Sequence, residues 1–291
     1  MMTELLKRAN EIKDELVSWR RTIHQNPELG LELPQTSAFV QKQLDEMGIS
    51  YTTIVNGSGV LAQLGPKEGK CFMLRSDMDA LPIQEETGLP FASCNAGKMH
   101  ACGHDLHTAL LLGAAKLLKE RESELRGPVK LLFQPAEETG KGATDFINAG
   151  ALDGAERILG LHSAPDLPLG TIGLTPGLNN AAVDHFRILV HGKAAHVSTP
   201  QLGADALYAA SQIVVAIQGL VARRSSPVEP VLLGVGHFAA GTTYNAVAEY
   251  AELEGTTRTI SPETRLQVRE WIDQTAEQIA AISGAEARVI W

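Results

Sequence analysis

The alternation of apolar and polar positions divides the chain into two parts that follow different patterns. In the first part, amphipathic helical stretches alternate with short apolar runs of the kind that form strands. Helices are predicted at residues 4–25, 34–47, 105–120 and 141–149, and strands at residues 60–64, 71–74, 129–133 and 158–161, the last of them buried. Strands that alternate with helices are typical of an α/β fold, and we predict a mostly parallel sheet for this part.

The pattern changes near Gly177, and the remaining elements follow the order strand–helix–strand–strand–helix–strand. The strands are predicted at residues 184–191, 231–235, 248–258 and 287–291, and the helices at residues 203–222 and 261–282. Strict alternation over residues 248–258 indicates a strand with one face in water. This order of elements is typical of a small open-faced α+β sandwich. The sequence therefore predicts two domains, residues 1–177 and residues 178–291.

The composition argues against several classes of partner. The 291 residues carry a formal net charge of −9 and no basic tract, so neither nucleic acid nor an anionic membrane is expected as a partner. The charged N-terminus shows no signal peptide, and no apolar run approaches the ~20 residues of a membrane-spanning helix. Three cysteines without framework spacing indicate a reducing compartment. We therefore expect a cytoplasmic protein.

The densest group of reactive side chains lies between Met99 and Thr108. This stretch contains the thiol of Cys102, three imidazoles and a carboxylate, and an adjacent glutamate pair, Glu137 and Glu138, follows downstream. Thiolate, imidazole and carboxylate are the ligands that bind zinc and similar divalent transition metals. A glutamate beside a ligand glutamate can take the proton of a metal-activated water. The sequence therefore predicts a metal-dependent hydrolase.

The same chemistry follows the predicted strands at their carboxyl ends. Asp77 and Asp79 follow one strand, the glutamate pair follows the next, and His162 follows the last. In open parallel sheets, ligands bind at the carboxyl ends of the strands. This placement supports the predicted site independently of any motif.

Taken singly, the candidate residues have ordinary structural explanations. His100, His104 and His107 could be helix-start or surface residues, and Cys102 could be a small buried hydrophobe. Taken together, the run Cys-Gly-His-Asp-x-His, the glutamate pair and the later histidine are hard to explain by packing alone.

For other polar residues the sequence leaves the role open. His24 and Asp105 are as consistent with a structural role as with a catalytic one. Three imidazoles of the second part are expected at the surface rather than at a metal: His185, His191 and His237.

Five motifs occur together in the order found in one known family. They are Arg20-Arg21-x-x-His24-x-x-Pro27-Glu28-Leu29, Asp77-Met78-Asp79-Ala80-Leu81-Pro82, His100-Ala101-Cys102-Gly103-His104-Asp105-x-His107-Thr108, Gln134-Pro135-Ala136-Glu137-Glu138 and Gly160-Leu161-His162. The chain resembles the metal-dependent amidohydrolases related to aminoacylase, glutamate carboxypeptidase, hippurate hydrolase and the plant auxin-conjugate hydrolases. The resemblance points to the hippurate hydrolase branch, in which a cysteine replaces one usual metal ligand.

The resemblance implies an α/β catalytic domain with two divalent metal ions, which could be zinc, manganese, nickel or cobalt. Cys102, His104, Glu138 and His162 match metal ligands of this site. Glu137 matches the general base that activates the attacking water.

The resemblance also implies roles for residues around the metals and in an inserted lid domain. Asp77 and Asp79 match residues that orient the ligands. In the lid, His196 matches a histidine that reaches the site of a neighbouring subunit and stabilises the oxyanion, and Asn245 and Arg258 match residues near the substrate carboxylate. A homodimer formed through the lid is therefore expected.

The chain departs from the family pattern at three places. Gln201 follows Pro200 where the family usually has a histidine, and Ser163 follows His162 where the family usually has an aromatic residue. The family's chain also returns from the lid to complete the metal-binding domain and supplies a further histidine ligand, and no such return is seen before Trp291.

Two functions follow from these observations. The first is hydrolysis of the amide bond of N-acyl amino acids or similar small conjugates by a metal-activated water, with a glutamate as general base. The alternative is a truncated, non-catalytic remnant, or half of a split enzyme, that acts only as a binding or association module.

Overall fold

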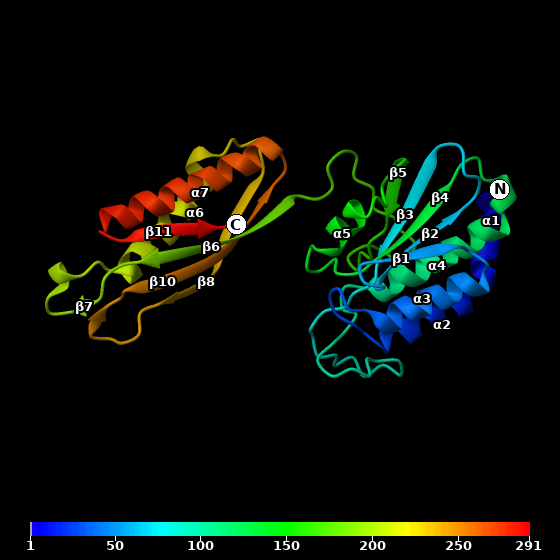
Figure 1. The fold of residues 1–291 in the computed structure, drawn as a ribbon, viewed down its shortest axis with the longest axis horizontal. Helices are drawn as coiled ribbons and strands as arrows, with labels where there is room; N and C mark the ends of the chain where they lie inside the picture. The colour runs from blue at the N-terminus through cyan, green and yellow to red at the C-terminus, as the bar shows by residue number, and fades with distance from the viewer. Residues whose placement is uncertain (1) are drawn as a thin grey trace. The chain divides into compact units, whose positions relative to one another are not determined.

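The computed structural model describes residues 2–291 and divides the chain into two compact units (Figure 1). The first unit ends at Thr171 and the second spans Ile172–Trp291. This division lies a few residues before the predicted boundary between residues 177 and 178. Each unit has a hydrophobic core of its own.

The first unit contains a five-stranded sheet with the order β1-β2-β4-β3-β5. Its strands are β1 (Tyr51–Ile54), β2 (Gly59–Leu64), β3 (Cys71–Asp77), β4 (Val129–Gln134) and β5 (Ala155–Gly160). β3 runs parallel to β4 and β5, whereas β1, β2 and β4 pair antiparallel. The predicted α/β class is confirmed, but the sheet is mixed rather than mostly parallel. β1 was not expected, because its two central threonines are exposed and leave no apolar run to detect.

Helices cover both faces of this sheet. They are α1 (Met2–Glu11), α2 (Lys13–His24), α3 (Pro34–Glu46), α4 (His104–Glu120), the short 3₁₀ helix η1 (Glu122–Glu124) and α5 (Gly142–Asn148). The helix expected over residues 4–25 is divided in two at Ile12.

Strand β4 shows how the layers are built. Leu131 and Phe133 belong to the main core, to which α2, α3 and α4 contribute. Leu132 points to the opposite face and joins a smaller cluster with Phe146 of α5. Successive side chains of a strand point to opposite faces, so the consecutive apolar residues Leu131, Leu132 and Phe133 require a cover on both sides of the sheet.

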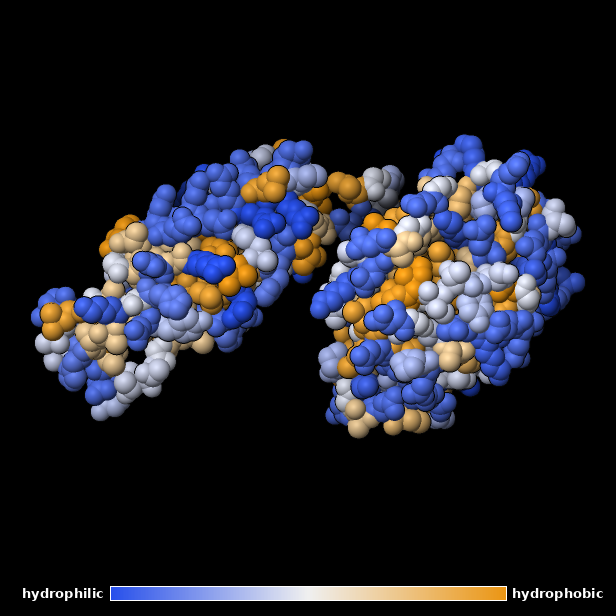
Figure 2. Space-filling model, in the orientation of Figure 1, coloured by the Kyte–Doolittle hydropathy of each residue, from blue (hydrophilic) through white to orange (hydrophobic). Residues whose placement is uncertain are grey.

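Strand β5 contradicts the expectation of a buried strand at residues 158–161. It lies at the edge of the sheet and pairs only with β3. Ile158 and Leu159 are about half exposed, and Figure 2 shows apolar side chains on the visible face of this unit, around α5 and the nearby sheet edge. An apolar run alone does not show how many faces of a strand are covered, which is why the sequence pattern misled here.

The second unit contains a four-stranded antiparallel sheet with the order β11-β6-β10-β8. Its strands are β6 (Ala182–His191), β8 (Val231–Ala240), β10 (Tyr250–Thr259) and β11 (Glu286–Ile290), and its helices are α6 (Ala206–Arg224) and α7 (Pro262–Ile282). The inward side chains of β6 and β10 pack against both helices. The order of elements agrees with the expected α+β sandwich. A small antiparallel pair, β7 (Ala195–His196) and β9 (Ala246–Val247), and the 3₁₀ helix η2 (Pro200–Leu202) were not predicted.

Helix α6 is the one helix among the described residues that is long and apolar enough to cross a membrane by length and composition. One such helix is weak evidence, because a core helix of a soluble protein can pass the same test. Ala210, Ile213 and Ile217 of α6 are fully buried in the core of the unit. Tyr208 and Val215 are exposed, so α6 also presents an apolar face to the outside.

Candidate functional site

Three parallel strands and one helix bring the predicted metal-site residues to one edge of the first unit. Asp77 ends β3, Glu137 and Glu138 follow β4, and His162 follows β5. His104 is the first residue of α4, with Cys102 in the loop just before it. Because β3, β4 and β5 run parallel, their carboxyl ends lie at the same edge of the sheet.

The candidate ligand atoms lie close together around His104. In three groups of residues, the possible ligand atoms all lie within 4.8 Å of one another. The groups are Cys102, His104 and His162; Asp77, His104 and His107; and His104, Glu137 and Glu138. The Cys102 Sγ lies 3.4 Å from the His162 Nε2, and the His104 Nε2 lies 3.7 Å from a Glu138 carboxylate oxygen. His104 therefore lies among a thiol, a second imidazole and two carboxylates.

The His104 ring is fully buried, and among the described residues neither of its nitrogens has a hydrogen-bond partner. Four carboxylates surround it within 4 Å: those of Asp77, Asp79, Glu137 and Glu138. A buried imidazole without a hydrogen bond and four clustered carboxylates are both costly unless a positive charge compensates the carboxylates. Sulfur, nitrogen and oxygen donors of this kind fit a divalent transition metal. The residues present therefore fit a metal site.

His107 is occupied by hydrogen bonds and is not free to bind a metal. Its Nε2 accepts a hydrogen bond of 2.8 Å from the Ser163 backbone N–H, and its Nδ1 lies 2.6 Å from the Asp77 Oδ1. Because an amide can only donate, the proton of His107 is on Nδ1 and is donated to Asp77. Burial alone would raise the pKa of Asp77, but the hydrogen bond from His107 and the nearby charges of His104 and Arg75 lower it to about 2.

Asp79 anchors the turn that carries the two glutamates. Its two carboxylate oxygens accept hydrogen bonds from the backbone N–H groups of Glu137 and Glu138, at 2.9 and 3.2 Å. The residue before them, Ala136, has a φ of +54°, in the left-handed region that residues other than glycine rarely adopt. Such conformations cost roughly 1–3 kcal/mol and persist only where the surroundings hold them. The hydrogen bonds to Asp79 are part of what holds this turn.

Burial and neighbouring carboxylates shift the pKa values of two side chains in the site. Burial and the Glu138 carboxylate raise the pKa of Glu137 above its usual value. Burial and the same carboxylate raise the pKa of the Cys102 thiol to about 12. A cation among these groups would favour the thiolate, because an opposite charge stabilises the ionised form.

A second buried network lies beside the metal-site residues. The His24 Nδ1 lies 2.8 Å from an Asp105 oxygen, and its Nε2 lies 3.2 Å from a Glu85 oxygen. Arg20 donates to the same Asp105 oxygen at 2.8 Å. These contacts favour the structural explanation of His24 and Asp105 over a catalytic one. Sequence reasoning missed Glu85, which has no distinctive neighbours in the sequence.

His100 is buried next to this network, and neither of its ring nitrogens has a hydrogen-bond partner among the described residues. Burial is the main reason why its pKa falls to about 4. The His100 ring is therefore neutral at physiological pH.

The predicted lid residues fall into two separate places in the second unit. His196 lies in β7, and the carbonyl oxygen of Asn245, just before β9, accepts the N–H of Val197 at 3.1 Å. Arg258 lies near the far end of β10, opposite Val183 at the start of β6. Arg258 is eight residues from Tyr250 at the beginning of that strand, or about 26 Å at 3.3 Å per residue. Within this unit the structure brings His196 and Asn245 together but not Arg258.

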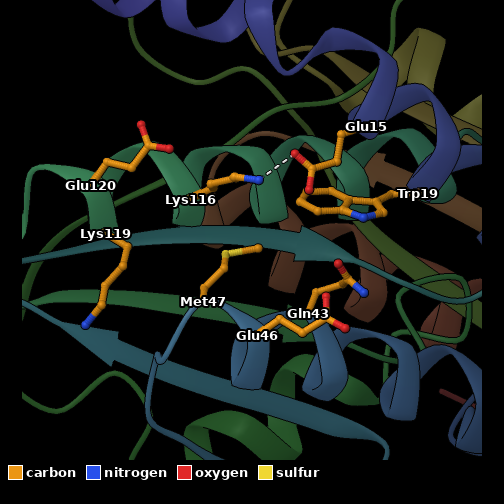
Figure 3. A pocket seen from close by; sticks show the side chains of 8 residues that line it. All are labelled: Glu15, Trp19, Gln43, Glu46, Met47, Lys116, Lys119 and Glu120. Atoms are coloured by element: carbon orange, nitrogen blue, oxygen red, sulfur yellow. Dashed lines mark hydrogen bonds and ion pairs between the residues drawn. The ribbon is translucent and has the colours of Figure 1, made fainter.

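A hollow of about 230 Å³ lies between α2, α3 and α4, away from the predicted site residues (Figure 3). Trp19 and Met47 form its apolar part. Its charged side chains are already paired: Lys116 binds Glu15 at 2.6 Å, Lys119 binds Glu122, and Glu120 binds Arg8. We therefore assign no ligand to it.

Comparisons with known proteins agree with this geometry. The sequence model of Peptidase family M20/M25/M40 matches residues 73–288. The chain is 46% identical over 281 residues to N-acetyl-L-cysteine deacetylase of Bacillus subtilis (strain 168), covering 96% of this chain and 68% of the relative. It is 39% identical over 288 residues to N-acyl-L-amino acid amidohydrolase of Geobacillus stearothermophilus, covering 98% and 78%.

A solved structure shares the fold. The Bacillus subtilis YXEP protein, described as a dinuclear metal-binding peptidase of the M20 family, superposes with a TM-score of 0.83 at 39% identity, covering 97% of this chain and 74% of that one. The family model covers most of the chain, and the relatives match nearly all of it. The chain thus belongs to Peptidase family M20/M25/M40, a family of hydrolases.

Proposed function

We propose that this chain hydrolyses the amide bond of N-acyl amino acids or similar small conjugates. The observation that carries the proposal is the buried His104, which has no hydrogen bond and lies among a thiol, a second imidazole and two adjacent glutamates. The relatives named as a deacetylase and an amidohydrolase support the same bond type. They match nearly the whole chain, so the alternative of a module that only associates is not favoured.

Cys102, His104, Glu138 and His162 would hold two divalent metal ions, such as zinc, manganese, nickel or cobalt. When bound, the metals polarise the amide carbonyl and acidify the attacking water. The relative YXEP, described as dinuclear, supports the number of ions.

Glu137 is the general base in this proposal. It lies beside Glu138 and is itself partly exposed, so a substrate and a water can reach it. Glu137 takes the proton of the attacking water and delivers it to the nitrogen of the departing amine. Asp77 and Asp79 hold the surrounding side chains and the glutamate turn in place.

The lid supplies the remaining groups. His196 would donate an N–H to the oxyanion, and Asn245 and Arg258 would bind the substrate carboxylate. The Ser198 N–H lies 3.2 Å from the His196 Nδ1 and can only donate, which leaves Nε2 as the protonated nitrogen. Arg258 lies at the opposite end of the lid sheet from His196 and Asn245. Two copies of the lid, each serving the other's site, would resolve this separation.

A homodimer through the lid is therefore part of the proposal. The exposed apolar side chains of α6 and the unpaired edge of β8 offer the surface. Sedimentation at micromolar concentration should give the mass of two chains, and a strictly monomeric mass would contradict it. We place the enzyme in the cytoplasm on the cysteine pattern and the acidic balance of the sequence.

Replacing Glu137 with glutamine tests the proposal. Turnover of a panel of N-acetyl amino acids should fall by roughly 10²–10⁴-fold, the usual loss for a general base. Metal content and thermal midpoint should stay as in the wild type. Glu124→Gln, which changes an exposed glutamate paired with Arg121, is the matched control and should retain full activity. Near wild-type turnover by Glu137→Gln would reject the role.

A further inference from the structure

Ser163 connects three parts of the metal site, although no motif points to it. Its backbone N–H donates to the His107 Nε2 at 2.8 Å, and its hydroxyl donates to the Cys102 carbonyl oxygen at 2.9 Å. Its own carbonyl oxygen lies 2.8 Å from the His162 Nδ1. One residue thus bonds the loop before α4, the first turn of α4 and the ligand histidine beside it.

These bonds fix which nitrogen of His162 is free. A carbonyl oxygen only accepts, so the His162 Nδ1 carries the proton and donates it to Ser163. The other nitrogen, Nε2, is left with its lone pair and faces the Cys102 Sγ at 3.4 Å. A neutral imidazole binds a metal through its unprotonated nitrogen, and the bond made by the other nitrogen decides which one that is.

The contact with Cys102 depends on a close approach. Gly103 has a φ of +92°, and a Cβ built on it would lie 2.7 Å from the Ser163 hydroxyl oxygen. Only glycine combines this backbone conformation with the space that Ser163 occupies. The hydroxyl therefore sits against the backbone between two proposed ligands, Cys102 and His104.

We infer that Ser163 is a positioning residue whose hydroxyl holds the loops of Cys102 and His162 at a fixed separation, while its carbonyl oxygen sets the nitrogen that His162 presents to a metal. This inference rests on the proposed metal site, and Ser163 acts through the two ligands without touching the substrate. It also gives a role to a position where the chain departs from the usual family pattern.

Zinc affinity of the whole chain, measured by competition with a chromophoric chelator, tests the inference. Ser163→Ala removes only the hydroxyl bond, and the affinity should fall about tenfold, the lower end of the range for partners that orient metal ligands. The variants Ser163→Thr and Ser163→Val introduce side chains of nearly the same shape, but only the threonine side chain keeps a hydroxyl. Zinc should bind the threonine variant at least several-fold more tightly than the valine variant.

The matched control is Ser37→Ala in the same unit. The Ser37 hydroxyl also donates to a backbone carbonyl oxygen, that of Gly57, at 2.7 Å. This control should lower the thermal midpoint and leave zinc affinity unchanged. If Ser163→Ala and Ser37→Ala change both quantities alike, the hydroxyl of Ser163 is only structural and the inference is overturned.

Cys102→Ser separates failure of the inference from failure of the proposed site. If this variant loses zinc affinity while Ser163→Ala binds as the wild type does, the site stands and the inference is wrong. If Cys102→Ser also binds as the wild type does, the proposed site itself is wrong, and the inference fails with it.

Discussion

The two units of this chain differ in how many titratable side chains they bury and in where these side chains lie. The first unit buries charged and titratable side chains at the carboxyl ends of its parallel strands, including Asp77, Asp79 and His104. In the second unit the buried polar residues are Asp184, Thr257 and Thr259, and the predicted functional residues His196 and Asn245 lie exposed at loops and strand ends. Buried charge is unfavourable unless it is compensated, whereas an apolar core is stable by itself.

This difference indicates that the stability of the two units depends on different interactions. At the edge of the first unit, four carboxylates lie within 4 Å of the His104 imidazole, which has no hydrogen bond. A bound cation would turn their mutual repulsion into attraction. The second unit holds no comparable cluster among its described residues. We therefore expect metal to stabilise one unit and to leave the other unchanged.

Removal of metal gives the largest expected difference between the units. With free metal some hundred- to thousandfold above Kd, the bound ion should stabilise the first unit by roughly 3–4 kcal/mol. Hydrogen exchange followed by mass spectrometry should show faster exchange in β3 and β4 after chelation. The strands β6 and β10 of the same molecule serve as the internal control. If chelation accelerated hydrogen exchange equally in both units, the proposed difference between the units would be wrong.

A smaller effect should appear in the second unit when the pH falls. Arg265 donates two hydrogen bonds to the Asp184 carboxylate, at 2.7 and 2.8 Å. These bonds lower the pKa of Asp184 below its usual value. A carboxyl whose pKa is lower in the folded state stabilises the fold above its unfolded pKa of about 4, and this stabilisation is lost as the pH falls through the folded pKa. Since Arg265 is 43% exposed, solvent screening limits the effect to about 1 kcal/mol or less.

Asp184→Asn tests this through denaturant unfolding of the second unit. The variant should be less stable than the wild type at pH 7, and the difference in stability should shrink as the pH falls from about 4 through the folded pKa of Asp184. Asp166→Asn, at an exposed position of the first unit, is the control and should show no gap. A gap that persists at low pH would mean that Asp184 acts through packing rather than through its charge.

The sequence predicted those features that depend on local pattern. The strands β3 and β4, the helix α4 and the sandwich of the second unit all follow from apolar periodicity. The convergence of Asp77, the glutamate pair and His162 follows from the rule that parallel strands end at one edge.

Features that depend on distant contacts could not be predicted. The exposure of β5 depends on which residues pack over it. The Nε2 atom of His107 accepts a hydrogen bond from the backbone N–H of Ser163, which is 56 residues away in sequence. The proposed role of Ser163 follows from one hydrogen bond with its neighbour His162 and two with distant segments, and the two distant bonds leave no trace in the residues around Ser163.

Cobalt titration of the whole chain tests most directly that Cys102 belongs to a metal site at this edge. The wild type should develop a near-ultraviolet absorption from thiolate bound to cobalt, which saturates as the site fills. The exposed Cys94 provides a matched control, so Cys94→Ser should keep the absorption and Cys102→Ser should lose it. No thiolate absorption in the wild type, or the same absorption in Cys102→Ser, would contradict the account.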